Sequence, residues 1–249
     1  MIERRDSENP TWNEHADWWI EGFTDGADPE YEEQIIPLVL EELSGAASIL
    51  DVGCGEGQIS RRLFAASSDR RVVGVDPTQR QIEVALARGG GPEYRVAGAD
   101  SLPFDDGCFD AVLACLVFEH IDALDEAIAE VARVLKPGGI FLFLLNHPLL
   151  QTPDSGWIDD QVLDPPEQYW RIGDYLTESI NVEQVEPGIY VRFVHRPLGR
   201  YLNTLAENEL FLEKMHEPAP PRGFLDRSPD YAMAVGIPRL LALRLRKLG

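Results

Sequence analysis

The sequence predicts an α/β fold built on an open, mostly parallel sheet with helices on both faces. The first observation is a turn with three alternating glycines, residues 53–57, which follows an apolar run and precedes a helical pattern. A strand, a tight glycine turn and a helix form the first half of a nucleotide-binding βαβ unit. The second observation is that five strand-like runs alternate with four helical patterns between residues 30 and 145. Such alternation is typical of a parallel sheet whose crossover helices cover its faces.

Each element is predicted from its own local pattern. Residues 30–43 place apolar side chains at helical spacing on one side, which predicts an amphipathic helix. Residues 109–115 are almost continuously apolar, as expected for a central parallel strand. Pro77 suits the first turn of a helix over residues 77–88, and the glycines that follow end this helix. The other predicted strands cover residues 48–52, 71–76, 93–97 and 140–145, and the other predicted helices cover residues 58–64 and 122–135.

Both ends of the chain and a long insertion depart from this alternation. Residues 11–20 predict a helix with Thr11 as its N-cap, and their three tryptophans suit either a lid over an apolar pocket or packing on the core. Residues 176–186 and 188–195 predict two strands around a proline–glycine turn. Residues 198–208 predict a helix, and residues 209–216 and 237–245 predict strands. We therefore divide the chain into an N-terminal helical lid segment (1–34), a ligand-binding core (35–146), an insertion that sets substrate specificity (147–196) and a part that completes the sheet (197–249).

The composition narrows the class of protein. With 249 residues, 44% of them apolar, the chain can bury a sizeable core. Its formal net charge of −21 repels phosphate backbones, so we expect no nucleic-acid partner. The three cysteines form no Cys-x-x-Cys pair and the first residues lack an apolar signal core, which predicts no metal site and a cytoplasmic protein. No run approaches the roughly 20 apolar residues of a membrane helix, so we expect no membrane partner and a monomer or homodimer acting on a small molecule.

The residues around the glycine turn help to decide which ligand it holds. Asp76 ends the second strand, where its carboxylate can accept hydrogen bonds from both hydroxyls of a ribose. Nicotinamide dinucleotides and S-adenosylmethionine both carry such a diol. A dinucleotide fingerprint requires a third glycine where this chain has Gln58. The acids Asp51 and Glu56 oppose a pyrophosphate but suit an ammonium or a sulfonium. Asp100, after the third strand, can accept a hydrogen bond from an exocyclic adenine amine.

Together these motifs resemble those of class I S-adenosylmethionine-dependent methyltransferases of the small-molecule type. The resemblance rests on residues 50–57, 73–76, 98–104, 109–112, 119–121 and 135–139, in that order. It implies a doubly wound, Rossmann-like sheet of seven strands with an antiparallel last strand. It also implies S-adenosyl-L-methionine as cofactor and in-line transfer of its methyl group to a small molecule, most readily at oxygen rather than at nitrogen or carbon.

The resemblance further implies the residues that bind the cofactor. The methionine portion would be lined by Asp51, Gly53, Cys54 and Gly55. Asp76 would hold the ribose hydroxyls, and Pro77 or Thr78 would touch the adenine. Asp100 and Ser101 would hold the adenine edge, and Cys115 and Leu116 would offer backbone carbonyls to the amino group.

Candidates for the acceptor side lie at the carboxyl ends of strands, and a base is needed only where the acceptor must lose a proton. His120 follows the fourth strand, His147 follows the fifth, and His195 ends the second strand of the insertion. These three histidines are the candidate catalytic residues, with His147 foremost, although each could also fix a local turn. The candidate substrate-binding residues are Trp18, Trp19, Tyr31, His147 and His195, and aromatic residues of the insertion could extend the wall of the pocket: Trp157, Tyr169 and Trp170.

Two other functions remain open from the sequence. An NAD(P)-dependent oxidoreductase would use the same glycine turn and the same acid at position 76. A regulatory protein that binds S-adenosylmethionine without turnover would keep the whole cleft. Tighter binding of NADH than of S-adenosylhomocysteine would favour the oxidoreductase, and a cleft blocked by the tryptophan segment would favour the regulatory protein.

Overall fold

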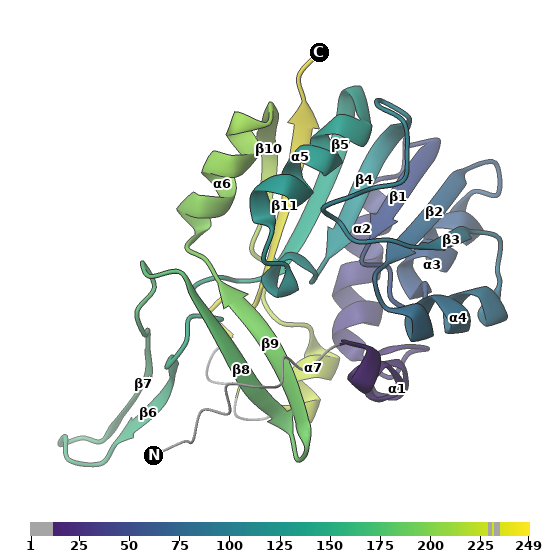
Figure 1. The fold of residues 1–249 in the computed structure, drawn as a ribbon. Coiled ribbons are helices and arrows are strands. Elements are labelled where there is room, and N and C mark those ends of the chain that lie inside the picture. Colours follow the sequence, from purple (N-terminus) through teal and green to yellow (C-terminus); the bar gives the residue numbers. More distant parts are fainter. Residues whose placement is uncertain (1–11, 229–230, 232–234) are drawn as a thin grey trace.

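The computed structural model describes residues 12–228, 231 and 235–249, so the predicted N-cap Thr11 lies outside the described residues. One large sheet contains the strands β1 (Ser48–Val52), β2 (Arg71–Asp76), β3 (Glu93–Val96), β4 (Phe109–Cys115), β5 (Leu135–Asn146), β10 (Leu210–His216) and β11 (Leu240–Lys247). Its strand order is β10-β11-β5-β4-β1-β2-β3 (Figure 1). Strands β1 to β5 pair in parallel, whereas β11 runs antiparallel to both β5 and β10. The predicted seven-stranded, mostly parallel sheet with an antiparallel last strand is confirmed.

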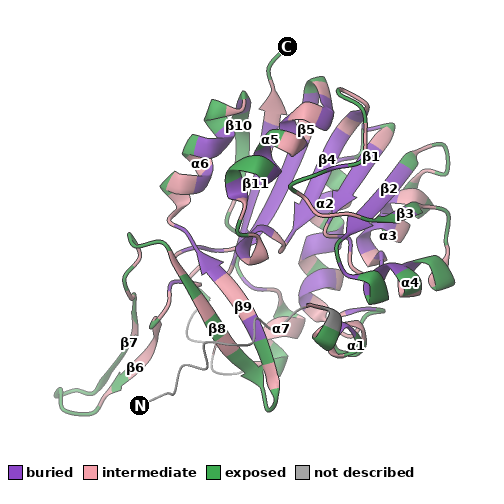
Figure 2. Ribbon diagram, viewed as in Figure 1, coloured by how far each residue is buried: buried purple, intermediate pink, exposed green. Residues whose placement is uncertain are grey.

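Helices cover both faces of this sheet because its strands are apolar on both sides. On one face, the strand residues Leu50 and Val112 share a core with α5 (Leu124–Val134) and α6 (Leu198–Glu207). On the other face, the adjacent strand residues Ile49 and Leu113 pack with α2 (Ile36–Glu42) and α3 (Gln58–Ala66). Successive strand residues thus enter opposite cores, as the period of two requires. Figure 2 shows this burial along the central strands β1 and β4, whereas the edge strands β3 and β10 are largely exposed.

Two predicted helices differ from their expected form. The helix expected over residues 30–43 consists of a π-helical turn, η1 (Tyr31–Ile35), followed directly by α2. The helix α4 (Gln79–Arg88) begins after Pro77, and not at it as predicted. The reason is local: a carboxylate oxygen of Asp76 accepts the backbone N–H of Thr78 at 2.8 Å, and Thr78 is extended. The glycine stop is confirmed, since Gly89 follows the last helical residue with a φ of +62°.

The insertion contains two hairpins. The hairpin of β8 (Ser179–Glu186) and β9 (Ile189–His195) was expected from the sequence. The hairpin of β6 (Gly156–Asp160) and β7 (Glu167–Arg171) was not, because it projects away from the large sheet and is largely exposed, so it shows no apolar alternation (Figures 1 and 2). The short helix α7 (Arg222–Arg227) was also missed within a proline-rich loop. Among the described residues, no helix combines the length and the apolar character that crossing a membrane requires.

Candidate functional site

The site begins at the glycine turn that follows β1. The backbone N–H groups of Gly53 and Cys54 both donate to the carbonyl of Val75, at 2.7 and 3.0 Å, which ties the turn to β2. Gly53 has a φ of +71°, and a Cβ placed on it would lie 2.4 Å from a methyl carbon of Val117. Only glycine therefore lets the turn approach the end of β4 this closely.

A cavity opens over this turn, at the carboxyl ends of β1, β2 and β4 and beneath the helix α1 (Trp12–Phe23). Most of the predicted cofactor-binding residues line this cavity. From the turn come Asp51, Gly53, Cys54 and Gly55, from the end of β2 come Asp76, Pro77 and Thr78, and from the end of β4 come Cys115 and Leu116. The topology thus brings together residues that are up to 65 positions apart in the chain, at the edge where α/β sheets bind ligands.

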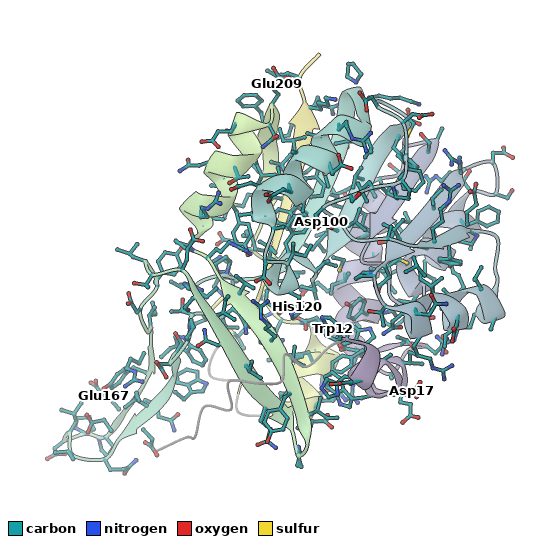
Figure 3. All side chains as sticks on the ribbon, in the orientation of Figure 1. Trp12, Asp17, Asp100, His120, Glu167 and Glu209 are labelled. Atoms are coloured by element: carbon teal, nitrogen blue, oxygen red, sulfur yellow. The ribbon has the colours of Figure 1, made fainter. Side chains whose placement is uncertain are left out.

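Asp100 and Ser101 are the predicted cofactor-binding residues that are not among the residues lining the cavity. Both are exposed, in the loop between β3 and β4. Figure 3 places Asp100 apart from His120 and Trp12, two residues that do line the cavity. Of the residues predicted to contact adenine, Pro77 and Thr78 therefore line the cavity, whereas Asp100 and Ser101 do not.

Two buried acids face the cavity without a cation beside them in the described part of the chain. Asp76 uses one carboxylate oxygen to accept the N–H of Gly55 at 2.9 Å and the other to accept that of Thr78, and burial raises its pKa. Asp51 accepts a hydrogen bond from the hydroxyl of Ser60 at 2.6 Å. Burial raises the pKa of Asp51 to about 7, and the neighbouring carboxylates of Asp76 and Glu56 add to this rise.

The sequence predicted that the third acid, Glu56, adds negative charge to the turn. In the structure its carboxylate is instead paired with two arginines. Its side chain is buried and one oxygen receives both Arg61 at 2.6 Å and Arg88 at 2.5 Å. The two guanidinium groups neutralise this carboxylate, so the negative charge available to a ligand comes from Asp51 and Asp76. A ligand with a cationic group and a diol fits this pair, because each carboxylate oxygen of Asp76 retains a lone pair.

The cavity contains a further hydrogen-bond acceptor that was not predicted from the sequence. Gln81, on α4, lines the cavity, and its Oε1 is buried with no hydrogen-bond partner in the described residues. A buried acceptor without a partner costs about 1–3 kcal/mol, so this atom points to a ligand that donates to it. Gln81 lies in the first turn of α4, directly after β2, which is the signal that could have found it, because that turn begins at the strand end that borders the cavity.

His120 is the predicted catalytic histidine that lines the cavity. Its Nδ1 lies 2.8 Å from the backbone carbonyl of Arg192, and since a carbonyl only accepts, Nδ1 carries the proton. In the neutral ring Nε2 then holds a lone pair. Burial lowers the pKa of His120 to about 4, so the ring is neutral near pH 7. The rings of Trp12 and Phe193 contact it at 4.9 and 4.8 Å.

The other two candidate histidines are buried but are not among the residues that line the cavity. His147 accepts the N–H of Leu149 at Nδ1, 3.2 Å away, and its Nε2 lies 2.8 Å from a carboxylate oxygen of Glu217. His195 places Nε2 2.9 Å from the carbonyl of Tyr175. Each of these rings thus makes bonds that fix the end of β5 or of β9.

The tryptophan helix α1 borders the cavity with Trp12, which lies beside His120 (Figure 3). Trp19 and Tyr31, two of the candidate substrate-binding residues, line the cavity, and so does Trp12, whose ring is 5.7 Å from that of Trp19. Trp18 is not among the lining residues and contacts Phe23 instead, at 5.1 Å. The spacing of seven between Trp12 and Trp19 puts both on one helical face, which explains why they enter the cavity together.

The remaining aromatic candidates lie elsewhere. Trp157 and Trp170 face each other across the β6–β7 hairpin at 5.6 Å, and Tyr169 in the same hairpin is exposed. The uncharged side of the cavity is formed instead by Leu116, Val117 and Ile121, which follow β4. Of these three residues, only Leu116 was predicted from the sequence. Their apolar character resembles ordinary core, so the sequence held no signal that separates them from it.

Comparisons with known proteins agree with this geometry. Residues 50–143 match the protein family described as a methyltransferase domain. The chain is 36% identical over 106 residues to a ubiquinone/menaquinone biosynthesis C-methyltransferase of Desulfotalea psychrophila (42% of this chain, 43% of the relative). It is 37% identical over 116 residues to a malonyl-[acyl-carrier protein] O-methyltransferase of Geobacter sulfurreducens (45% of this chain, 43% of the relative). The chain spans about half the length of the curated relatives it matches.

Solved structures extend the similarity over nearly the whole fold. A crystal structure of an S-adenosylmethionine-dependent methyltransferase from Mesorhizobium loti superposes with a TM-score of 0.71 at 27% identity, covering 90% of this chain and 99% of that one. A geranyl diphosphate C-methyltransferase from Streptomyces coelicolor, solved with S-adenosyl-L-homocysteine, gives a TM-score of 0.61 at 16% identity, covering 96% and 98%. The second similarity concerns the fold alone.

Proposed function

We propose that this chain, whose residues 50–143 match the methyltransferase domain family, is a class I S-adenosylmethionine-dependent methyltransferase that transfers a methyl group from S-adenosylmethionine to a small-molecule acceptor. The observation that carries the proposal is the pair of buried acids, Asp51 and Asp76, that face the cavity over the glycine turn without a cation beside them in the described residues. The cofactor would supply an electrophilic methyl group on a sulfonium, whose positive charge these acids favour.

The residues of the cavity divide the work of binding. Asp76 would accept hydrogen bonds from the ribose hydroxyls, and Asp51 would attract the cationic amino-acid end of the cofactor. Gln81 offers a buried acceptor on the same side of the cavity. Holding the methyl group in line with the acceptor atom supplies most of the acceleration in such a displacement.

We propose oxygen as the methylated atom, because of His120. Its Nε2 lone pair can accept a hydrogen bond from an acceptor hydroxyl and take the proton as the new O–C bond forms. With a pKa of about 4, this ring is a weak base. It therefore favours a hydroxyl more acidic than that of a simple alcohol, such as a phenol or an enol. The uncharged residues around it, Trp12, Leu116 and Ile121, favour an apolar acceptor.

Isothermal titration calorimetry tests the cofactor half of this proposal. S-adenosylhomocysteine should bind to the wild-type protein more tightly than NADH does, and Asp76→Ala should weaken it by about tenfold or more, because a charge-assisted bond worth about 1.5–3 kcal/mol is lost. Asp69→Ala, at an exposed position, is the matched control. Absence of binding at millimolar S-adenosylhomocysteine would refute the proposal, and preferential binding of NADH would favour an oxidoreductase.

Methyl transfer tests the acceptor half. Methyl-labelled S-adenosylmethionine should label phenolic or enolic acceptors from a small panel, and His120→Gln should lower this labelling while leaving the affinity for S-adenosylhomocysteine unchanged. Gln keeps a hydrogen-bond donor but offers no basic nitrogen. Equal labelling by wild type and His120→Gln would exclude His120 as the base, and labelled carbon in place of oxygen would correct the reaction type.

A further inference from the structure

The β8–β9 hairpin of the insertion contacts the turn that carries His120. This turn, residues 118–122, begins with the short 3₁₀ helix η2 (Phe118–His120) at the end of β4. The carbonyl of Arg192 on β9 accepts the Nδ1 proton of His120 at 2.8 Å. The ring of the next residue, Phe193, packs against the same imidazole at 4.8 Å. The insertion therefore supplies the group that determines which nitrogen of His120 is protonated.

Immediately after β9, Arg196 binds the backbone of the same turn. Its guanidinium donates to the carbonyl of Phe118 at 3.2 Å, of Ile121 at 2.7 Å and of Asp122 at 2.9 Å. These carbonyls lie on both sides of His120 in the chain. The nearest carboxylate is that of Glu178, 3.9 Å away and about half exposed. Arg196 is therefore held chiefly by three peptide carbonyls rather than by a close counter-ion.

Burying a cation in this way has an energetic cost. Only 4% of Arg196 is exposed, and the desolvation of an ion costs several kcal/mol that a loose pair does not recover. Hydrogen bonds from a charged donor are stronger than those between neutral groups, so three of them hold the arginine and the turn together. Because the guanidinium is planar and its donors have fixed directions, it also fixes the three carbonyls relative to one another. Lysine cannot reproduce this geometry.

We infer that Arg196 is a positioning residue for His120: it holds residues 118–122 against β9 so that Nδ1 keeps its proton, donates it in a hydrogen bond to the Arg192 carbonyl, and leaves Nε2 for the acceptor. The importance of this arrangement for activity rests on the proposed function. Arg196 contacts no residue of the glycine turn in the described hydrogen bonds, so the affinity for the cofactor should not depend on it. The insertion thereby determines which nitrogen of His120, the proposed base, is protonated, while the ligand-binding core (35–146) binds the methyl donor.

The environment of His120 makes the state of its ring measurable. From α1 it is contacted by Trp12 and from β9 by Phe193, both neutral. The charged side chain acting on it is that of Arg192, which together with burial lowers its pKa. The adjacent Glu119 directs one carboxylate oxygen to the side-chain amide of Asn146, at 2.9 Å. A loosened turn would admit water to the ring, and its pKa would then rise toward 6.5, the ordinary value for histidine.

The test is a long-range ¹H–¹⁵N spectrum of the histidine rings recorded between pH 4.5 and 8, with His120 assigned by comparison with His120→Gln. In the wild-type protein His120 should stay neutral, with its proton on Nδ1, down to about pH 5. In Arg196→Met it should titrate near 6.5 and move part of its proton to Nε2, and Arg196→Lys should fall between the two. Arg200→Met is the matched control, because Arg200 pairs with Asp125 and makes no bond to residues 118–122.

A folded Arg196→Met protein whose His120 keeps its tautomer and its titration would overturn the inference. If this variant does not fold, Arg196→Lys decides on the same criterion, with circular dichroism as the measure of folding. Binding of S-adenosylhomocysteine should change less than twofold in every folded variant. Failure of the wild-type protein to bind it would refute the proposed function, whereas an unchanged His120 spectrum would refute only the role of Arg196.

Discussion

Replacement of Asp51 by asparagine should make the stability of the protein less dependent on pH. Asp51 is 2% exposed, and its carboxyl group accepts a hydrogen bond from Ser60 while facing the cavity. Burial raises its pKa from 3.8 to about 7. Between these values the folded protein keeps a proton on Asp51 that the unfolded chain has released. The free energy of unfolding therefore falls as pH rises from about 4 to 7.

The size of this effect follows from the shift in pKa. One pKa unit corresponds to 1.36 kcal/mol, so ionised Asp51 costs the folded state on the order of 4 kcal/mol above pH 7. At pH 5 about 1.5 kcal/mol of this cost has already appeared, because the unfolded chain is then largely ionised. The free energy of unfolding of Asp51→Asn minus that of wild type should accordingly increase by about 3 kcal/mol between pH 5 and pH 8. Any constant loss from the altered bond to Ser60 cancels in this comparison.

Urea denaturation of both proteins at pH 5, 6, 7 and 8, followed by circular dichroism, measures this difference. Asp69→Asn is the control, because it removes a negative charge from an exposed position and should give a difference that is nearly constant with pH. A difference for Asp51→Asn that also stays constant would refute the reasoning, since it would mean that Asp51 is ionised in the folded protein throughout this range. Stabilisation at pH 8 with loss of cofactor affinity would identify Asp51 as a residue kept for binding.

Three further predictions concern binding, packing and salt. The affinity for S-adenosylmethionine should fall by up to about tenfold per pH unit below pH 7, as Asp51 gains a proton and loses its attraction for a cation, and calorimetry of Asp51→Asn should show a weaker pH dependence. Gly57→Ala should destabilise the protein by about 2–4 kcal/mol, because its Cβ would lie 2.3 Å from the Tyr94 hydroxyl at a φ of +83°; Gly89→Ala, with nothing within 4 Å, should cost less in the same urea titration, because only the backbone strain at its φ of +62° remains. Raising NaCl from 0.05 to 1 M should raise the melting temperature, by about 2–4 °C for each kcal/mol of relieved repulsion, because the net charge is −21; a melting temperature that falls with salt would contradict this.

Local patterns in the sequence were sufficient for the fold and for much of the donor side of the site. A short apolar run indicates a strand, and closely spaced glycines indicate a tight turn because they adopt positive φ without strain. Asp51 and Asp76 each lie at the end of β1 or β2, and the carboxyl ends of neighbouring parallel strands share one edge of the sheet. Their proximity therefore follows from the order of the elements. The paired hairpin β8–β9 was equally readable from its alternation and its turn.

The tertiary structure decided what the chain order leaves open. The negative charge of Glu56 is paired with Arg61 and Arg88, which come from two different helices. The exposed hairpin β6–β7 buries neither face in the core, so no periodicity marks it.

The sequence by itself determined that this chain forms a seven-stranded, mostly parallel sheet with acids gathered over a glycine turn, because those features depend on local patterns and on strand order. It could not choose among its three candidate histidines. His120, His147 and His195 each follow or end a strand, yet only the contacts of the turn after β4 direct one of them to the cavity. That choice depends on Arg192 and Arg196, more than 70 residues away in the chain, whose bonds exist only after the insertion has folded against the sheet.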